Sequence, residues 1–350
     1  MVWFLCCGRS VPNAGRCILV EWPLTSRCSV RFIVLGVLVG TGLATLAQTE
    51  SNVDGRHATA ARARSDEIAA RNQLLEYIQS GKLDEAITRG RDFVGRWPTD
   101  AELHHLLGVA YFKTRQNALA IEQLQKAGRL DASSPDIPFD QALVFLDQKQ
   151  YVPAALELEK SIKLYPSNAL AHVLLGRAYQ NSNRSLRAIE EFKTALRLNP
   201  DLPLGHFHLG FAYSSVGLRQ QAISEYKKEI ERSSNNPGVL YQLGHELVES
   251  GDLKSGMGYL EKAIEIQPQY GDALYDLGKA KLLAGDVAAA ITFLQRSAAL
   301  NPADPAPHYQ LARAFDNLGQ SEDARKERQR FAELKKAQPQ TGGMASGQAQ

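Results

Sequence analysis

Between residues 67 and 338, apolar residues recur at the spacing of amphipathic helices, and short polar turns separate the blocks. Residues 169–202 show the pattern most clearly. Within them a Leu-Gly pair, two alanines, two aromatic residues and a closing proline stand at Leu175, Gly176, Tyr179, Ala188, Phe192, Ala195 and Pro200. A polar Asn-Ser-Asn turn at 181–183 divides this stretch into two halves of about 14 residues each. The pattern predicts two helices joined by a short turn.

The small residues of this stretch recur in steps of 34 residues on both sides of it. When each unit is numbered from 1 to 34, position 8 reads Leu74, Gly108, Ala142, Gly176, Gly210, Gly244, Gly278 and Ala312. Position 20 reads Ala86, Ala120, Ala154, Ala188, Ala222, Gly256, Ala290 and Ala324. The recurrence predicts eight stacked units with bounds 67–100, 101–134, 135–168, 169–202, 203–236, 237–270, 271–304 and 305–338.

These positions resemble the signature of the tetratricopeptide repeat, a helix-turn-helix unit of 34 residues. Its aromatic position 11 is occupied by Tyr77, Tyr111, Phe145, Tyr179, Tyr213 and Phe315, and the proline closing the second helix by Pro98, Pro166, Pro200, Pro268 and Pro302. The resemblance covers about four fifths of the chain. It implies an all-α fold, a right-handed superhelical α-solenoid of stacked antiparallel helix pairs with a concave inner surface.

Some units depart from the pattern. Leu74 stands at the small position 8 of the first unit, Gly90 stands where a large apolar residue is usual, and Arg328 takes that same position in the last unit. Irregular residues are expected in terminal units, which lack one neighbour. Gly256 and Gly258 are expected to interrupt the second helix of the sixth unit and to lower local stability around residues 250–260, because glycine costs about 1 kcal/mol in a helix relative to alanine.

The N-terminal region has the layout of a secretory signal. Residues 32–47 form an uncharged, mostly apolar run that follows Arg27 and Arg31 and ends in small residues. An uncleaved anchor is the main alternative, because tilt or bilayer thinning compensates for a run shorter than about 20 residues; a buried helix is the other. We expect residues 1–47 to direct export, to a periplasmic or extracellular location, with membrane contact only through residues 32–47 if they are retained.

Two further segments lie outside the repeats. Residues 48–66 are small and polar and are expected to be a linker, and residues 339–350, rich in Gly, Gln and Ser, a disordered tail. All cysteines precede residue 30, at Cys6, Cys7, Cys17 and Cys28. Neither a disulfide framework nor a thiolate metal site is therefore expected in the repeats.

The charge of the chain argues against nucleic acid as a partner. The formal net charge is +2, but residues 1–47 hold four arginines and one acidic residue, which leaves 36 basic and 37 acidic residues in the remainder. A nearly neutral body lacks the clustered cations that bind phosphates. We expect no nucleic-acid partner.

No stretch remains to house a catalytic domain, and the nucleotide-binding, hydrolase and paired-cysteine motifs are absent from the sequence. His245 to Glu249 looks like half of a zinc-protease motif, but Glu249 replaces the second histidine. Four histidines share position 4 and are expected to pack and hydrogen-bond between helices: His104, His172, His206 and His308. We expect no enzyme activity, no cofactor and no metal.

In the tetratricopeptide repeat family, which the sequence resembles, one flank of the first helix lines the concave groove. This flank consists of positions 2, 5, 9 and 12. Positions 5 and 9 carry aromatic and basic side chains that offer contact area and a partner for an acidic group, although the rings could instead only cover the adjacent helix. The candidate partner-binding residues are Phe139, Phe207, Phe211, Tyr241, His245, Tyr275, Lys279, Tyr309 and Arg313.

The sequence thus predicts a non-catalytic scaffold outside the cytoplasm that binds a peptide or partner protein in the concave groove. Two alternatives remain open. One is a recognition or regulatory subunit of an envelope enzyme system that acts on glycan or cell wall. The other is an accessory of secretion or pilus assembly.

Overall fold

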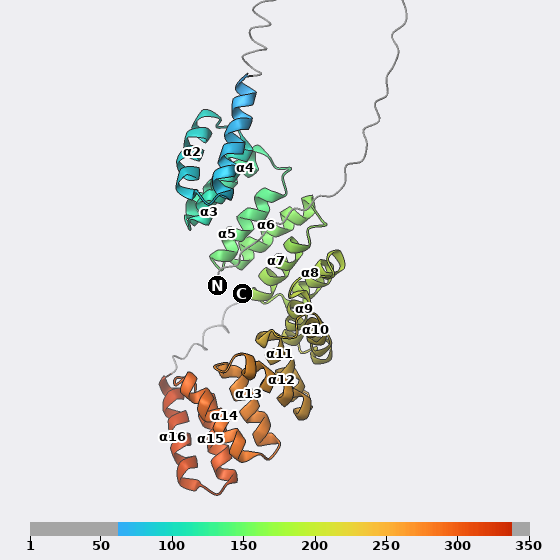
Figure 1. Cartoon of the computed structure of the whole chain (residues 1–350), viewed down its shortest axis with the longest axis vertical. Coiled ribbons are helices and arrows are strands. Elements are labelled where there is room, and N and C mark those ends of the chain that lie inside the picture. The colour runs from blue at the N-terminus through green and yellow to red at the C-terminus, as the bar shows by residue number, and fades with distance from the viewer. Residues whose placement is uncertain (1–61, 338–350) are drawn as a thin grey trace, which may run out of the picture. The chain divides into compact units, whose positions relative to one another are not determined.

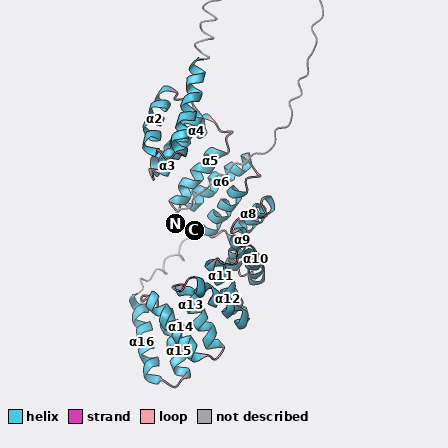
Figure 2. Cartoon of the chain, viewed as in Figure 1, coloured by secondary structure: helices cyan, strands magenta, loops and turns pink. Residues whose placement is uncertain are grey.

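The computed structural model describes residues 62–337, and these form helices joined by short turns, without a strand (Figure 2). The first helix covers residues 62–79. Fifteen helices follow, of which α2 pairs with the first helix and the others pair in chain order (Figure 1): α2 (Leu83–Arg96), α3 (Ala101–Lys113), α4 (Asn117–Leu130), α5 (Asp136–Asp147), α6 (Tyr151–Leu164), α7 (Ala169–Asn181), α8 (Ser185–Leu198), α9 (Gly205–Ser215), α10 (Arg219–Arg232), α11 (Pro237–Glu249), α12 (Leu253–Ile266), α13 (Gly271–Leu283), α14 (Val287–Leu300), α15 (Ala306–Asn317) and α16 (Ser321–Ala337).

The first helix begins inside the segment expected to be a linker, since residues 62–66 are already helical. The rest of that segment, the predicted leader at 1–47 and the predicted tail at 339–350 lie outside the described residues. Within 62–337, no helix is both long and apolar enough to cross a membrane.

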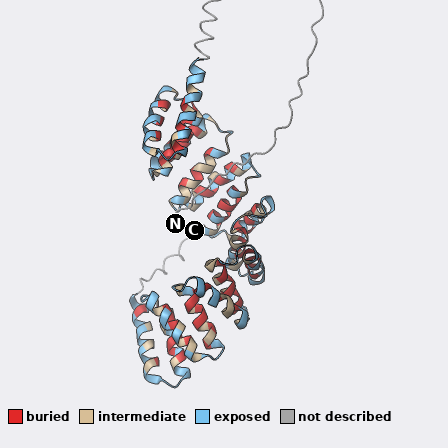
Figure 3. Cartoon of the chain, in the orientation of Figure 1, coloured by how far each residue is buried: buried red, intermediate tan, exposed pale blue. Residues whose placement is uncertain are grey.

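Each helix packs mainly against the helices before and after it in the chain. The buried residues therefore form successive small clusters, and they run along every pair of the stack (Figure 3). First helices of neighbouring units also touch one another, at α3–α5, α7–α9, α9–α11, α11–α13 and α13–α15. No two second helices among the described residues pack to this extent.

The turn inside each unit is made by a left-handed residue at position 15. The eight residues are Gly81, Arg115, Lys149, Asn183, Gly217, Gly251, Gly285 and Gly319, with φ between 58° and 92°. Glycine adopts this conformation freely, whereas a side chain there is strained. The turn thus explains the glycine in five units, and Arg115 and Lys149 adopt the strained conformation.

The small residues at position 8 let the two helices of a unit approach closely. A Cβ atom added to Gly176 would lie 2.6 Å from Phe192, and one added to Gly210 would lie 2.8 Å from Tyr226. These rings stand at position 24 of their units, which lies on the second helix. The expectation that position 8 is small for close helix packing is confirmed.

The first unit exchanges the large and small partners of this contact. Leu74 is fully buried, and its side chain lies against Gly90, where an added Cβ would meet Leu74 Cδ1 at 3.4 Å. A large residue at position 8 is thus matched by glycine at position 24. Leu74 and Gly90 are therefore a pair of buried residues whose sizes compensate each other. The lack of a neighbouring unit is not needed to explain them.

Gly256 does not interrupt a helix, which corrects the expectation from its sequence. The helix α12 runs unbroken over Leu253–Ile266. A Cβ at Gly256 would lie 2.9 Å from the carbonyl oxygen of Gly244 and 2.9 Å from the backbone nitrogen of Val248. Gly256 therefore serves the close approach of α11 and α12, whereas Gly258 has no atom within 4 Å of its added Cβ.

The start of α9 is held by a side chain of the following helix. Leu204, at the N-cap, is left-handed with φ 58° and provides no side-chain cap. Glu229 of α10, which is buried, accepts hydrogen bonds from the backbone N–H groups of Leu204 at 3.2 Å and Phe207 at 3.3 Å. Glu229 thus satisfies N–H groups that a capping side chain would otherwise bind, and it fixes the helix that carries Phe207.

Candidate functional site

The candidate partner-binding residues all lie on first helices, at positions 5 and 9 of their units. Phe139 lies on α5, and the remaining residues lie on α9, α11, α13 and α15: Phe207, Phe211, Tyr241, His245, Tyr275, Lys279, Tyr309 and Arg313. Most of these side chains are half-buried, and Phe211 and Tyr309 are exposed at 41% and 48%. We call this set the position-5/9 face.

The rings at position 5 pack against neighbouring helices and keep part of their surface accessible. Phe207 lies 6.0 Å from Tyr226 of α10 between ring centroids, and Tyr241 lies 4.9 Å from Tyr270. Burial, together with the negative charge of Asp276, raises the pKa of Tyr241. These aromatic rings therefore cover the adjacent helix and leave part of their surface accessible to solvent. Their contact with a partner stays a prediction.

Two of the basic residues at position 9 are already paired with carboxylates. His245 Nδ1 lies 2.7 Å from Asp276 Oδ2, and this hydrogen bond raises the pKa of His245. Lys279 Nζ donates to Glu249 Oε1 at 2.7 Å, which raises the pKa of Lys279 and lowers that of Glu249. These two cations link neighbouring units, so they offer less attraction to an external acidic group than their sequence suggests.

Arg313 differs from these two cations because no carboxylate pairs with it among residues 62–337. Its Nη1 donates to Gln310 Oε1 at 3.1 Å, and its guanidinium lies 6.0 Å from the ring centre of Tyr309. The amide of Gln310 in turn lies 3.5 Å from the hydroxyl of Tyr275. The α13–α15 end of the face thus joins two tyrosines to one exposed guanidinium.

Acidic residues at position 6 were missed as part of this face. Asp140 and Asp276 each accept a hydrogen bond from a histidine of the preceding unit, His105 in one case and His245 in the other. Burial lowers the pKa of His105, but hydrogen bonds to Asp140 and Glu102 outweigh it and raise the pKa to about 9. The signal in the sequence was a histidine followed by an aspartate 35 or 31 residues later.

The position-4 histidines pack and hydrogen-bond between helices, as expected. Each places Nδ1 against the residue 19 positions later, on the second helix of the same unit. The pairs are His104–Gln123 at 2.7 Å and, each at 2.6 Å, His172–Glu191, His206–Glu225 and His308–Glu327. No group of three or more metal-binding side chains is gathered within residues 62–337.

Sequence models of one repeat family match three parts of the chain. Models described as tetratricopeptide repeat match residues 247–299 and 281–341 and residues 71–135, and one described as TPR repeat matches residues 187–217. A curated protein of Drosophila melanogaster, the BBSome complex member BBS4 homolog, is 28% identical over 94 residues. This match spans 27% of the present chain and 19% of that protein.

Solved structures of other proteins share this fold. The APC/C hetero-tetramer Cut9-Hcn1 aligns with a TM-score of 0.52 and 19% identity over 69% of this chain and 48% of that chain. PilW, a type IV pilus biogenesis factor, aligns with a TM-score of 0.52 and 19% identity over 57% of this chain and 92% of that chain. At these identities the likeness shows the fold alone. The repeats in the sequence, the stacked helix pairs and the matching sequence models together show that the chain belongs to the tetratricopeptide repeat family.

Proposed function

We propose that the protein is a non-catalytic interaction scaffold that binds a peptide segment of a partner protein on the position-5/9 face. The observation that carries the proposal is the series of half-exposed rings on α9, α11, α13 and α15, with Arg313 at its end. The few residues that carry most of the binding energy of a protein interface are enriched in tryptophan, tyrosine and arginine. Tyrosine adds a polar tip to a large apolar area.

The contacts between first helices support the position of this face. First helices of neighbouring units touch at α9–α11, α11–α13 and α13–α15, and second helices do not pack in this way among the described residues. A stack in which the first helices lie closer together than the second helices curves toward the first helices. The position-5/9 face would then line the concave side, where a peptide contacts several units at once.

The pairing of charges points to the orientation of the partner segment. His245 is paired with Asp276, and Lys279 is paired with Glu249. Arg313 instead contacts the neutral amide of Gln310 and the ring of Tyr309. An acidic group of the partner would therefore gain most at the α15 end, with an apolar or aromatic segment lying over the tyrosines. This favours a partner segment that carries one acidic residue at one end, because the paired cations leave little excess charge for a polyacidic stretch.

The setting outside the cytoplasm remains part of the proposal. It rests on the apolar run at 32–47 and the arginines Arg27 and Arg31 before it. Fractionation of cells that produce the full chain, with N-terminal sequencing of the product, tests it. Recovery of the intact leader in the cytoplasmic fraction would contradict export.

A triple variant tests the binding face. Tyr241, Tyr275 and Tyr309 are replaced together by alanine in the tagged full chain, and partner capture is quantified by mass spectrometry. Each truncation of a buried interface tyrosine costs about 2 kcal/mol, so capture should be lost. The matched control replaces three exposed apolar residues of second helices by alanine, Val152, Leu156 and Leu186, and should capture partners normally. Equal capture by the tyrosine variant and the control, with helical content retained in both, would refute the assignment.

A further inference from the structure

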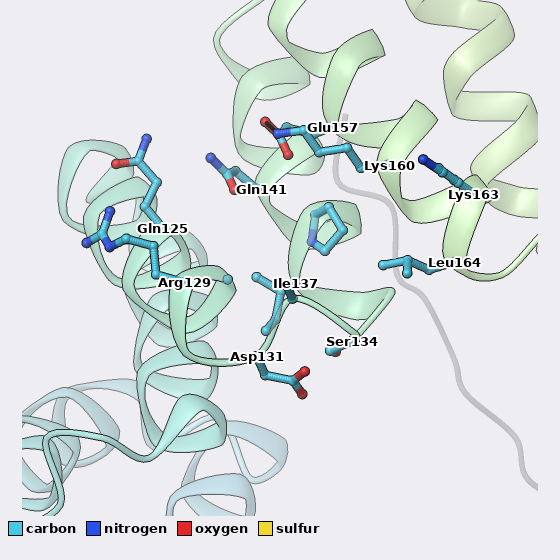
Figure 4. A pocket seen from close by; sticks show the side chains of 13 residues that line it. Gln125, Arg129, Asp131, Ser134, Ile137, Gln141, Glu157, Lys160, Lys163 and Leu164 are labelled. Carbon is cyan, nitrogen blue, oxygen red and sulfur yellow. Dashed lines mark hydrogen bonds and ion pairs between the residues drawn. The ribbon is translucent and has the colours of Figure 1, made fainter.

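A pocket of about 490 Å³ lies between α4, the start of α5 and α6 (Figure 4). Its wall includes Arg129 of α4, Ile137 and Gln141 of α5, and Lys160 and Lys163 of α6. None of the candidate residues of the position-5/9 face lines it. The pocket is therefore a separate feature of the second and third units.

Three departures from the repeat meet at this pocket. Gly128 occupies position 28, where other units carry Val94, Ile162, Leu196, Ile230, Ile264, Ala298 and Ala332. Pro138 occupies position 4, where four units carry the buried or half-buried histidine that pairs with the second helix. Gln141 occupies position 7, where six units carry leucine: Leu107, Leu175, Leu209, Leu243, Leu277 and Leu311. Gly128 and Pro138 are smaller than the residues they replace, and Gln141 brings an amide in place of an apolar side chain. All three line the same pocket.

The first unit also carries a glutamine at position 7, Gln73, but that residue is exposed, whereas Gln141 is buried. The side chain of Gln141 lines the pocket although the residue is only 8% exposed, and no residue within 62–337 hydrogen-bonds to its amide. The amide atoms of Gln141 are not among the fully buried polar atoms that lack a partner, so the amide is accessible from the pocket. An amide that faces a pocket offers donors and an acceptor to a bound molecule.

The charges around the pocket leave a net excess of cations. Lys160 Nζ donates to Glu157 Oε1 at 2.8 Å, and Asp131 accepts hydrogen bonds from the backbone and the hydroxyl of Ser133 at 2.9 and 2.6 Å. Arg129 and Lys163 have no carboxylate partner among the described residues. Ile137 and Pro138 provide apolar surface beside them.

We propose that this pocket binds a carboxylate joined to an apolar group. The carboxylate would pair with Arg129 or Lys163 and accept a hydrogen bond from the Gln141 amide, while the apolar group would lie on Ile137 and Pro138. The volume is in the range of small-molecule sites, about 300–1,000 Å³. The same chemistry occurs in a free organic acid and in the C-terminal residue of a peptide.

Calorimetric titration of the purified full chain tests the proposal with defined probes. N-acetyl-leucine represents the free acid, and an N-acetylated peptide ending in Gly-Gly-Leu with a free carboxylate represents a peptide end. The same peptide with an amidated end should not bind. Binding of N-acetyl-leucine alone assigns the site to free acids, and tighter binding of the peptide assigns it to peptide ends.

Four variants connect binding to the pocket. Gly128→Ile and Gln141→Leu introduce residues that other units carry at these positions, so they fill or neutralise the wall while keeping the pattern of the fold. Arg129→Gln and Lys163→Gln remove exposed cations, which leaves the packing of the helices unchanged. Gln141→Leu and the stronger of the two cation variants should each weaken binding about tenfold, as expected for the loss of one hydrogen bond to a charged group.

Tyr275→Ala, on the position-5/9 face, is the control and should bind the probes as the original chain does. Absence of binding of every carboxylate probe at millimolar concentration would overturn the proposal. Unchanged binding by Gly128→Ile and by the double variant R129Q/K163Q would overturn it as well. Either result would leave the test of the position-5/9 face unaffected, because the two sites share no residue.

Discussion

Two glycines in one helix should respond differently to the same substitution. Gly256 and Gly258 both lie inside α12, so replacing either by alanine gains about 1 kcal/mol of helix propensity. The two sites differ only in what the new methyl group meets. At Gly258 nothing lies within 4 Å of the added Cβ. Gly258→Ala should therefore stabilise the protein by about 1 kcal/mol.

At Gly256 the new methyl group would lie 2.9 Å from the carbonyl oxygen of Gly244 and 2.9 Å from the backbone nitrogen of Val248. Backbone atoms cannot rotate away as a side chain can, so α11 and α12 must separate. Such overpacking costs about 1–3 kcal/mol, which cancels or exceeds the gain in propensity. The two variants should thus differ in the free energy of unfolding by about 1–3 kcal/mol, with Gly256→Ala the less stable.

Guanidinium unfolding followed by circular dichroism compares the two variants with the original chain. Amide exchange read by mass spectrometry locates the effect, which should be confined to α11 and α12 in Gly256→Ala. The expectation that residues 250–260 are less stable than residues 170–195 is tested in the same exchange experiment on the original chain. Equal stabilisation by both substitutions would refute the close approach of α11 and α12.

Three further substitutions test other features of the stack. Tyr226 is fully buried, and its hydroxyl has no hydrogen-bond partner among the described residues. Tyr226→Phe should therefore leave the free energy of unfolding unchanged or raise it by about 1 kcal/mol. A decrease of more than about 1 kcal/mol in denaturant unfolding would contradict an unpaired hydroxyl. Lys149 is left-handed with φ 58°, so Lys149→Gly should stabilise the protein by about 0.5–1 kcal/mol. The reverse change, Gly285→Lys at the equivalent turn of another unit, should destabilise it. Changes of the same sign in denaturant unfolding would contradict a turn conformation shared by the two units. The pKa of His105 is raised to about 9, above the unfolded value of about 6.5, so its contribution is complete below pH 6.5 and is lost as the pH rises through 9. The free energy of unfolding should fall between pH 7 and 10 by up to about 3 kcal/mol more than in His105→Gln, and parallel pH profiles would contradict the link to Asp140.

The sequence predicts the architecture well because the repeat constrains each contact many times. Close packing of the two helices of a unit requires a small residue at position 8, and glycine or alanine stands there in every unit but the first. The first unit was misread because its departure was considered at single positions. Leu74 and Gly90 together restore the packing, which becomes visible only when positions 8 and 24 are considered as a pair.

A second pair of positions changes together in the same way. Histidine at position 4 accompanies glutamate or glutamine at position 23 in four units, and leucine at position 4 accompanies an aromatic residue at position 23 in two, Leu240 with Tyr259 and Leu274 with Phe293. The hydrogen bonds of the histidines give the physical reason for the first combination. The sequence could have revealed this coupling, because the internal repeats serve as their own alignment.

The face and the pocket were predicted less completely. Positions 5 and 9 could be assigned from the register, but the partners of their charges come from the neighbouring unit. Whether Lys279 is free or bound to Glu249 depends on how far one helix pair is rotated against the next, and the register alone does not fix that rotation. The pocket at Gln141 was missed because its three contributing residues lie on two units and are unremarkable one at a time.

Site-specific photocrosslinking tests the central proposal, capture of a partner on the position-5/9 face, most directly. A photoreactive amino acid is placed at Tyr275 or Tyr309 on this face, and at Leu156 or Leu186 on second helices, where both leucines are more than half exposed. We expect one partner to crosslink at both tyrosine positions, to a peptide segment identified by mass spectrometry, and not at the leucine positions. Crosslinks of that partner at Leu156 or Leu186 but not at Tyr275 or Tyr309 would contradict the proposal.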